Sequence, residues 1–307
     1  MLIYRRDLRL TGGDGRLPSN GKYTQNVSLL RGLRAASVAC AVIAFAGACS
    51  PAPEKSTTVD IATTTSVVNS GLLNALLPAF QKETGITVRV HAAGSGRALE
   101  MLNDGVVDLA ISHAPQAESQ MLARHSDWRY QKIATNQFVL VGPDSDPAGV
   151  RNAPDIVSAF KRIAAGDVEF ISRGDGSGTH ERESDLWTAA QAKPAPARML
   201  VSGAGMGATL RQASEQGAYT LTDDSTFMQL REQLTLAVLF SNDARLVNSY
   251  SVIHPRESST ASRLADWLAT GKGRQMIGGY TVKGTNVFAP WPNGCPGDQP
   301  AASVCKD

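Results

Sequence analysis

Four segments of this chain place hydroxyl side chains or glycines directly after a short strand pattern. The first, Thr63 to Ser66, precedes an amphipathic helical pattern, and the others are Gly94 to Gly96, Gly174 to Thr179 and Gly203 to Gly207. The start of a helix carries unpaired N–H groups and about half a positive charge, which favour a bound anion. A single Ser or Thr at such a position is usually only a helix cap. Four such segments in one chain indicate a site that collects an anion.

Arg173 is the cation best placed to contribute to this site. It follows a strand pattern and opens a loop whose glycines let the backbone approach a ligand closely, while Ser177 and Thr179 add hydroxyl donors. Its guanidinium group could donate to an oxyanion in a fixed, forked geometry. The alternative is that Arg173 pairs locally with Asp175 or Glu181.

Enzymatic interpretations fit the same segments less well. A secreted serine hydrolase would use Ser177 and His180, but Asp175 occupies the first glycine position of the Gly-x-Ser-x-Gly nucleophile motif. Gly203 to Ala208 fits a dinucleotide-binding pattern, with an acid, Asp223, about twenty residues further on. That pattern lies in mid-chain, and nicotinamide cofactors are normally absent outside the cytoplasm. Anion capture without catalysis or a cofactor is therefore favoured.

The N-terminal region predicts export. Arg31 and Arg34 precede an apolar run over 35–48 that ends in small residues, as in a secretory signal. This run is too short to span a bilayer comfortably, so we predict a signal region over residues 1–48. Residues 1–26 are polar and unlike a signal, and a mis-assigned start codon is one interpretation of them.

The cysteines outside the apolar run have two separate predicted roles. Cys49 follows Ala46-Gly47-Ala48, which predicts lipidation of Cys49, with ordinary signal cleavage as the alternative. Cys295 and Cys305 lie ten residues apart in a tail rich in Pro and Gly. In an oxidising compartment we expect them to form a disulfide, with two free thiols as the alternative. We therefore expect the protein in the periplasm or at the outer face of the cytoplasmic membrane.

Composition and pattern indicate a globular α/β protein. A net charge of +2, with 42% hydrophobic and 19% charged residues, gives no sign of a nucleic-acid surface. Strand patterns alternate with helical ones, which predicts parallel sheets covered by helices on both faces. The expected strands are 59–62, 86–90, 108–111, 138–141, 170–172, 199–201, 219–222, 236–240 and 250–253, and the expected helices are 72–80, 97–102, 156–163, 181–190, 210–215 and 260–277.

Two signatures resemble a known family. Thr63 to Ser66 with Ser70 to Leu73 resembles the substrate-binding proteins of tungstate-type ABC importers, and Ser172 to His180 resembles their second signature. Segments 105–110 and 136–143 are also similar, so the resemblance covers about residues 59–280. It implies a two-lobed type II periplasmic-binding-protein fold, each lobe a mostly parallel sheet flanked by helices. The implied parts are a tether (49–57), lobe I (58–135 plus 245–290), lobe II (136–244) and a C-terminal tail (291–307), with crossover segments near 135–137 and 240–245.

The resemblance also implies a ligand and a set of binding residues. The ligand would be a tetrahedral oxyanion, most simply tungstate, held between the lobes of a monomer and passed to an ABC permease. Molybdate, phosphate and sulfate are the alternatives; phosphate keeps a proton and would benefit from an acceptor such as Asp175, Asp223 or Asp224. The implied binding residues are Thr64, Thr65, Ser66 and Ser95 from lobe I, and Arg173, Ser177, Gly178, Thr179, Gly205 and Met206 from lobe II.

Overall fold

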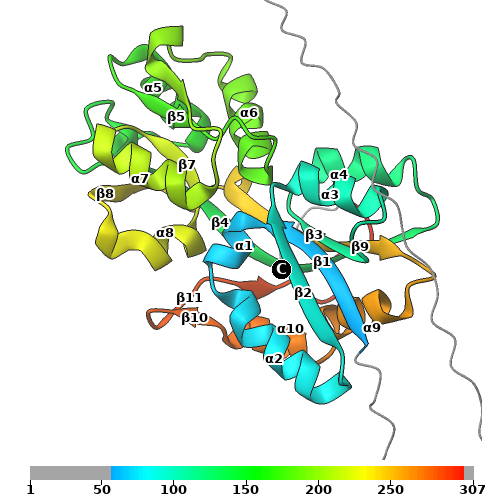
Figure 1. Ribbon diagram of the computed structural model, residues 1–307. Helices are drawn as coiled ribbons and strands as arrows, with labels where there is room; N and C mark the ends of the chain where they lie inside the picture. Colours follow the sequence, from blue (N-terminus) through cyan, green and yellow to red (C-terminus); the bar gives the residue numbers. More distant parts are fainter. Residues whose placement is uncertain (1–56, 301–307) are drawn as a thin grey trace, which may run out of the picture. The chain divides into compact units, whose positions relative to one another are not determined.

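The structure, a computed structural model, describes residues 57–300 (Figure 1). The predicted signal region, Cys49, nearly all of the tether and Cys305 lie outside the described residues. Within residues 57–300, no helix is long and apolar enough to cross a membrane. Cys295 is disulfide-bonded; because Cys305 lies outside the described residues, the pairing of these two cysteines stays a prediction.

The first part of the chain builds three parallel strands. Its elements are β1 (Thr58–Thr64), α1 (Thr65–Asn69), α2 (Leu72–Thr84), β2 (Thr87–Ala93), α3 (Ser95–Asn103), β3 (Leu109–Ser112) and α4 (Pro115–Leu122). β1 pairs in parallel with β2 on one side and with β3 on the other. Parallel neighbours need crossover connections, which α1, α2 and α3 supply. All three strands therefore end at the same edge of the sheet.

The middle part of the chain builds a second group of strands and helices. Its elements are α5 (Ile156–Ala165), β5 (Phe170–Ser172), α6 (Gly178–Ala190), β6 (Met199–Val201), α7 (Met206–Gln216), β7 (Thr220–Asp223), α8 (Asp224–Leu230) and β8 (Leu236–Phe240), with short 3-10 turns at 150–152, 196–198, 231–233 and 244–246. β5 pairs in parallel with β6. α5 buries Ile156, Ala159, Phe160 and Ile163, the spacing of one helix face. Figure 1 shows α5 to α8 grouped around β5, β7 and β8.

Two long strands join these groups. β4 (Trp128–Pro143) pairs antiparallel with β9 (Val247–Pro255) from Trp128 opposite Pro255 to Gln137 opposite Val247. Beyond Gln137, β4 continues into antiparallel pairings with β7 and β8. β9 also pairs antiparallel with β3. The antiparallel pairings of the main sheet thus come from the strands that run between the groups, while β1, β2 and β3 form its parallel part.

The C-terminal part differs from the single helix expected over 260–277. It forms two helices and three short strands, α9 (Ser259–Ala269), α10 (Lys272–Gly279), β10 (Thr281–Val282), β11 (Thr285–Asn286) and β12 (Ala289–Pro290). The expectation of one helix is wrong because Gly271 has extended backbone and caps α10. A Cβ at Gly271 would lie 3.0 Å from Trp267 Cα. Gly271 therefore lets the chain turn closely against α9.

The buried apolar side chains of residues 57–300 form four clusters, which we group by their elements into a first and a second core. The first core, around β1 to β3, α2, α9 and α10, draws its buried residues from 59–134 and 250–288. The second core, around α5 to α7, β5 and β7, draws its buried residues from 138–246. In the second core, the rings of Phe160 and Trp187 lie 4.4 Å apart between centroids. The predicted α/β class, with helices flanking the sheets, is confirmed; α1, α4 and α8 were not predicted.

Candidate functional site

Each glycine- or hydroxyl-rich segment leaves a strand and opens a helix, as the sequence predicts. Thr64 caps α1, Gly94 caps α3, Ser177 caps α6 and Gly205 caps α7. α3, α6 and α7 have 9, 13 and 11 residues, so the N–H groups at their starts favour an anion. α1 has only five residues and contributes mainly hydroxyl groups. We call residues 63–66, 94–96, 173–179 and 203–207 the donor segments.

The first donor segment holds a compact group of buried hydroxyls. Thr64 Oγ1 accepts the Val67 N–H at 3.3 Å and lies 2.9 Å from Ser66 Oγ. Thr63 Oγ1 is buried and has no hydrogen-bond partner among the described residues. Because a buried polar group is normally paired, this hydroxyl indicates a place where a ligand can supply the missing partner. Gly71, with a φ of 78°, ends α1 and separates it from α2.

The donor segments lie against one another although they are far apart in the sequence. A Cβ at Gly205 would lie 3.2 Å from Thr65 Oγ1. A Cβ at Gly94 would lie 3.8 Å from Ser177 Cα. Gly205 therefore lets the second core approach the Thr65 side chain closely, and Gly94 lies in ordinary contact with segment 173–179, so the two groups of donor segments meet.

Arg173, the predicted cation, is 2% exposed and held by three contacts. Nε donates to the Ala204 carbonyl oxygen at 2.9 Å, Nη1 lies 3.4 Å from Met206 Sδ, and Nη2 pairs with the Asp175 carboxylate. The local ion pair considered from the sequence is therefore present. A guanidinium group has five N–H donors, so donors remain for a ligand. The contacts with Ala204 and Met206 also fasten segment 173–179 to segment 203–207.

The Asp175 carboxylate bonds groups of its own loop. One carboxylate oxygen pairs with Arg173, and the other accepts the Ser177 N–H at 3.1 Å. The carboxylate offsets the positive charge of the guanidinium, so the loop presents directed N–H and O–H donors with little net charge. Asp175, Asp223 and Asp224 are the three acids that could accept the proton of phosphate. Of these, Asp175 already has a partner on both carboxylate oxygens.

The start of α6 contains a capping hydroxyl (Ser177), a glycine that approaches His113 closely (Gly178) and a buried hydroxyl without a partner in the described part of the chain (Thr179). Ser177 Oγ accepts the His180 N–H at 3.4 Å. A Cβ at Gly178 would lie 2.2 Å from the His113 carbonyl oxygen, so only glycine fits between α6 and the end of β3. Thr179 Oγ1 is buried and has no partner among the described residues. Thr179 is therefore a second hydroxyl that a ligand could satisfy.

A buried hydrogen-bond network behind the donor segments was missed from the sequence. Ser95 Oγ accepts the His113 N–H at 3.3 Å, and His113 Nδ1 lies 3.0 Å from Asn248 Oδ1. Asn248 Nδ2 donates to Asn136 Oδ1 at 2.7 Å, and Asn136 Nδ2 lies 3.3 Å from Ser225 Oγ. One signal was available: His113 directly follows a predicted strand that is parallel to β1, where functional side chains of α/β sheets gather.

Two neighbouring acids lie at the start of α8. Asp223 Oδ1 accepts the Ser225 hydroxyl at 2.5 Å and the Thr226 N–H at 2.8 Å, so Asp223 caps this helix. Burial, and then the charge of Asp223, raises the pKa of Asp224 to about 7. Asp223 Oδ2 and Asp224 Oδ1 are buried without a partner among the described residues. These two oxygens could accept a proton or a hydrogen bond.

The geometry does not support the hydrolase interpretation. Ser177 Oγ accepts a backbone N–H of α6, and His180 Nδ1 accepts the Gly176 N–H at 3.0 Å. Within residues 57–300, no hydrogen bond joins the Ser177 hydroxyl to the His180 ring. A base that accepts a backbone N–H is poorly placed to take a proton from a nucleophile.

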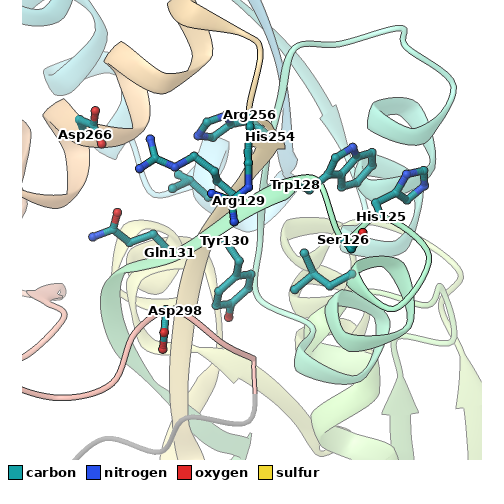
Figure 2. A pocket seen from close by; sticks show the side chains of 12 residues that line it. His125, Ser126, Trp128, Arg129, Tyr130, Gln131, His254, Arg256, Asp266 and Asp298 are labelled. Carbon is teal, nitrogen blue, oxygen red and sulfur yellow. The ribbon is translucent and has the colours of Figure 1, made fainter.

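A separate pocket of about 480 Å³ lies at the other end of the β4–β9 pair (Figure 2). It is lined by Trp128 and Arg129 at the start of β4, and by His254 and Arg256 at the end of β9. Along β4, Tyr130 in this pocket is about 20 Å from Asn136. None of the lining residues has a buried polar atom without a partner. The pocket therefore differs from the donor segments, where buried hydroxyls have no partner within residues 57–300.

Two cores joined by two strands, with donor segments of both cores meeting in between, are typical of periplasmic binding proteins. In agreement, the PBP superfamily domain matches residues 51–271. The chain is 37% identical to the tungstate-binding protein TupA of Peptoclostridium acidaminophilum over 241 residues, which cover 75% of this chain and 84% of that protein.

Comparison with solved structures also shows similarity to tungstate-binding proteins. The structure of the tungstate ABC transporter from Geobacter sulfurreducens has a TM-score of 0.67 and 35% identity, covering 73% of this chain and 98% of that chain. The tungstate-binding protein TupA from Desulfovibrio alaskensis G20 has a TM-score of 0.65 and 35% identity, covering 76% and 98%. The chain therefore belongs to the tungstate-type substrate-binding proteins of ABC transporters, and it is a binding protein for an oxyanion, not an enzyme.

Proposed function

We propose that the protein captures tungstate between its two cores and delivers it to an ABC permease. The observation that carries this proposal is the meeting of four donor segments whose donors are almost all neutral N–H and O–H groups. A dianion stripped of water needs many directed hydrogen bonds, and neutral donors at helix starts supply them. The names of the relatives support tungstate as the particular oxyanion.

The proposed contacts come from both cores. Arg173 adds charge-assisted donors, and the open hydroxyls of Thr63 and Thr179 gain partners when the anion binds. The proposed binding residues are Thr64, Thr65, Ser66 and Ser95 with the first core, and Arg173, Ser177, Gly178, Thr179, Gly205 and Met206 with the second core. We take the two cores as the lobes of a receptor that opens to load and closes to hide its ligand.

Phosphate is the second candidate, because of the acids at the start of α8. Phosphate at neutral pH keeps a proton, which an acceptor such as Asp223 Oδ2 or Asp224 Oδ1 could receive. Tungstate and molybdate are unprotonated and would be repelled by an unpaired carboxylate. The raised pKa of Asp224 favours its neutral form, which reduces that repulsion.

Export and anchoring belong to the same proposal. A protein that loads a permease from outside must leave the cytoplasm, which fits the signal pattern over residues 1–48. We propose a lipid on Cys49 as the membrane anchor. Metabolic lipid labelling should mark the wild-type protein and not Cys49→Ser; an unlabelled, released wild-type protein would instead mean ordinary signal cleavage.

Thermal unfolding with a panel of anions tests the proposed ligand. A ligand that binds only the folded state raises its stability by about 2.7 kcal/mol at a hundred times its Kd. We expect tungstate, at equal concentration, to raise the melting temperature more than phosphate or sulfate does. An equal or larger rise with phosphate would make phosphate the ligand and overturn the tungstate proposal.

A further inference from the structure

His113 stands behind the first donor segment in a fully buried position. It directly follows β3, is 2% exposed, and packs between the rings of Tyr250 and Phe138, whose centroids lie 5.1 and 6.2 Å from its own. Its ring nitrogens have different neighbours: Nδ1 lies 3.0 Å from Asn248 Oδ1, and Nε2 lies 3.5 Å from Ser66 Oγ. His113 thus connects a proposed binding residue with the network that crosses between β4 and β9.

The direction of that network determines which nitrogen carries the proton. The Asp223 carboxylate can only accept, so the Ser225 hydroxyl donates to it, and Ser225 Oγ in turn accepts from Asn136 Nδ2. Asn136 Oδ1 then accepts from Asn248 Nδ2, which leaves Asn248 Oδ1 facing His113. An amide oxygen needs a donor, so the hydrogen of the neutral ring is on Nδ1. Nε2 is left as a bare acceptor.

The bare Nε2 competes with an anion for the Ser66 hydroxyl. In the neutral state of the ring, the only group that can donate across the 3.5 Å contact is Ser66 Oγ–H, and Ser66 Oγ can accept from Thr64. An oxyanion that accepts a hydrogen bond from Ser66 removes this donor from His113. A buried acceptor without a partner is costly, and here it would face a negative charge.

We propose that His113 takes up a proton from solvent at Nε2 when the oxyanion binds. The new Nε2–H bond donates to Ser66 Oγ, and the Ser66 hydroxyl is released to donate to the anion. The imidazolium ring also compensates part of the negative charge at close range. This inference rests on the proposed oxyanion capture and makes His113 a positioning residue for Ser66.

The charged groups around His113 set the direction of the effect. Burial lowers the pKa of His113 to about 4, and Arg173 acts in the same direction, while Asp223 and Asp175 raise it. Glu181, Arg182 and Asp185 of α6 line a small cavity that His113 also lines. The ring is therefore neutral at pH 7 without ligand. A bound dianion raises the pKa of His113 above its ligand-free value. Between the ligand-free and the ligand-bound pKa, the affinity for the anion therefore increases as pH falls.

Calorimetric titration with dilute tungstate in buffers of different ionisation enthalpy measures the proton directly. At pH 6.5 we expect a net uptake of protons when tungstate binds, and an affinity that rises, by at most about tenfold per pH unit, as pH falls. His113→Gln should lose the uptake. His125→Gln, in the separate pocket, and His180→Gln should keep it, since neither ring contacts Ser66.

Two other results of the titration would contradict the proposals. Tungstate binding without proton uptake in the wild type would overturn this inference and leave the proposed function intact. Absence of binding by any tested oxyanion would overturn both. If His113→Gln does not fold, the imidazole NMR signals of wild-type His113 give the same information: its titration must move to higher pH with tungstate, and an unmoved titration would contradict the proposal.

Discussion

Thr179 offers a test of a single donor at the residue scale. Its hydroxyl is buried without a partner among the described residues, so Thr179→Val costs the unliganded protein no observed hydrogen bond. If that hydroxyl donates to the anion, the variant loses a charge-assisted bond of about 1.5–3 kcal/mol, or roughly a ten- to hundredfold weaker Kd. Thr226→Val is the matched control, because Thr226 also has a buried, unpartnered hydroxyl but lies outside the donor segments. Equal Kd values for the two variants would contradict the role of Thr179.

Glu118 gives a residue-scale prediction about stability. Burial raises its pKa to about 7, although Tyr130 and the Ala114 N–H bond its carboxylate at 2.9 and 3.0 Å. Between the unfolded pKa and pH 7 the folded state holds a proton that the unfolded state has lost. The free energy of unfolding should therefore fall as pH rises through this window, by up to roughly 1.4 kcal/mol per pH unit from this group.

The check on Glu118 is a comparison of variants. Glu118→Gln cannot lose the proton, so its stability relative to wild type should increase from pH 5 to pH 7.5 in denaturant titrations. Glu257→Gln, at an exposed position, should show no such trend. A constant difference between Glu118→Gln and wild type across this range would show that Glu118 does not titrate there.

At the scale of elements, α6 and α4 connect the two cores outside the donor segments. The Glu181 carboxylate accepts the N–H groups of Gln116 and Ala117 at 2.8 and 3.3 Å, at the start of α4. The Gln116 side chain also donates to Asp185 at 2.7 Å. α4 packs on the first core through Met121, and α6 packs in the second core through Trp187. α6 therefore contacts the first core one turn beyond its proposed anion-binding start.

We expect this contact to stabilise the closed state. Glu181→Ala should speed tungstate dissociation and weaken Kd by roughly tenfold, as expected for loss of charge-assisted hydrogen bonds. Glu215→Ala, exposed on α7, is the control. Stopped-flow measurement of the tungstate dissociation rate tests whether the contact between α4 and α6 stabilises the closed state. An unchanged rate in Glu181→Ala would mean that it does not.

The elements also show what the sequence could and could not predict. The donor segments were predicted because strand, glycine, hydroxyl and helix follow one another locally, and local patterns determine caps and turns. The break at Gly271 was missed because Leu264, Trp267 and Leu268 continue a helical pattern towards Ile277. The bond between His113 and Asn248, 135 residues apart, depends on strand pairing that no local pattern reveals.

At the scale of the whole molecule, β4 and β9 are the only long strands among residues 57–300 that could act as a hinge between the cores. Ligand contacts from both sides shift such an equilibrium towards the closed state, because only differential contacts can do so. Small-angle scattering should therefore give a smaller radius of gyration with tungstate than without it. Arg173→Ala should reduce this compaction, and an identical radius in both states of the wild type would indicate a rigid, preformed site.

Calorimetric competition between anions tests the central claim most directly, that this molecule is a tungstate receptor. Titration of the purified protein with tungstate should give one site per chain, and prior addition of phosphate or sulfate in large excess should leave that binding nearly unchanged. The unprotonated state of tungstate separates it from phosphate, and the tungstate-binding relatives support the same preference over sulfate. Binding of phosphate as tight as or tighter than that of tungstate would contradict the claim.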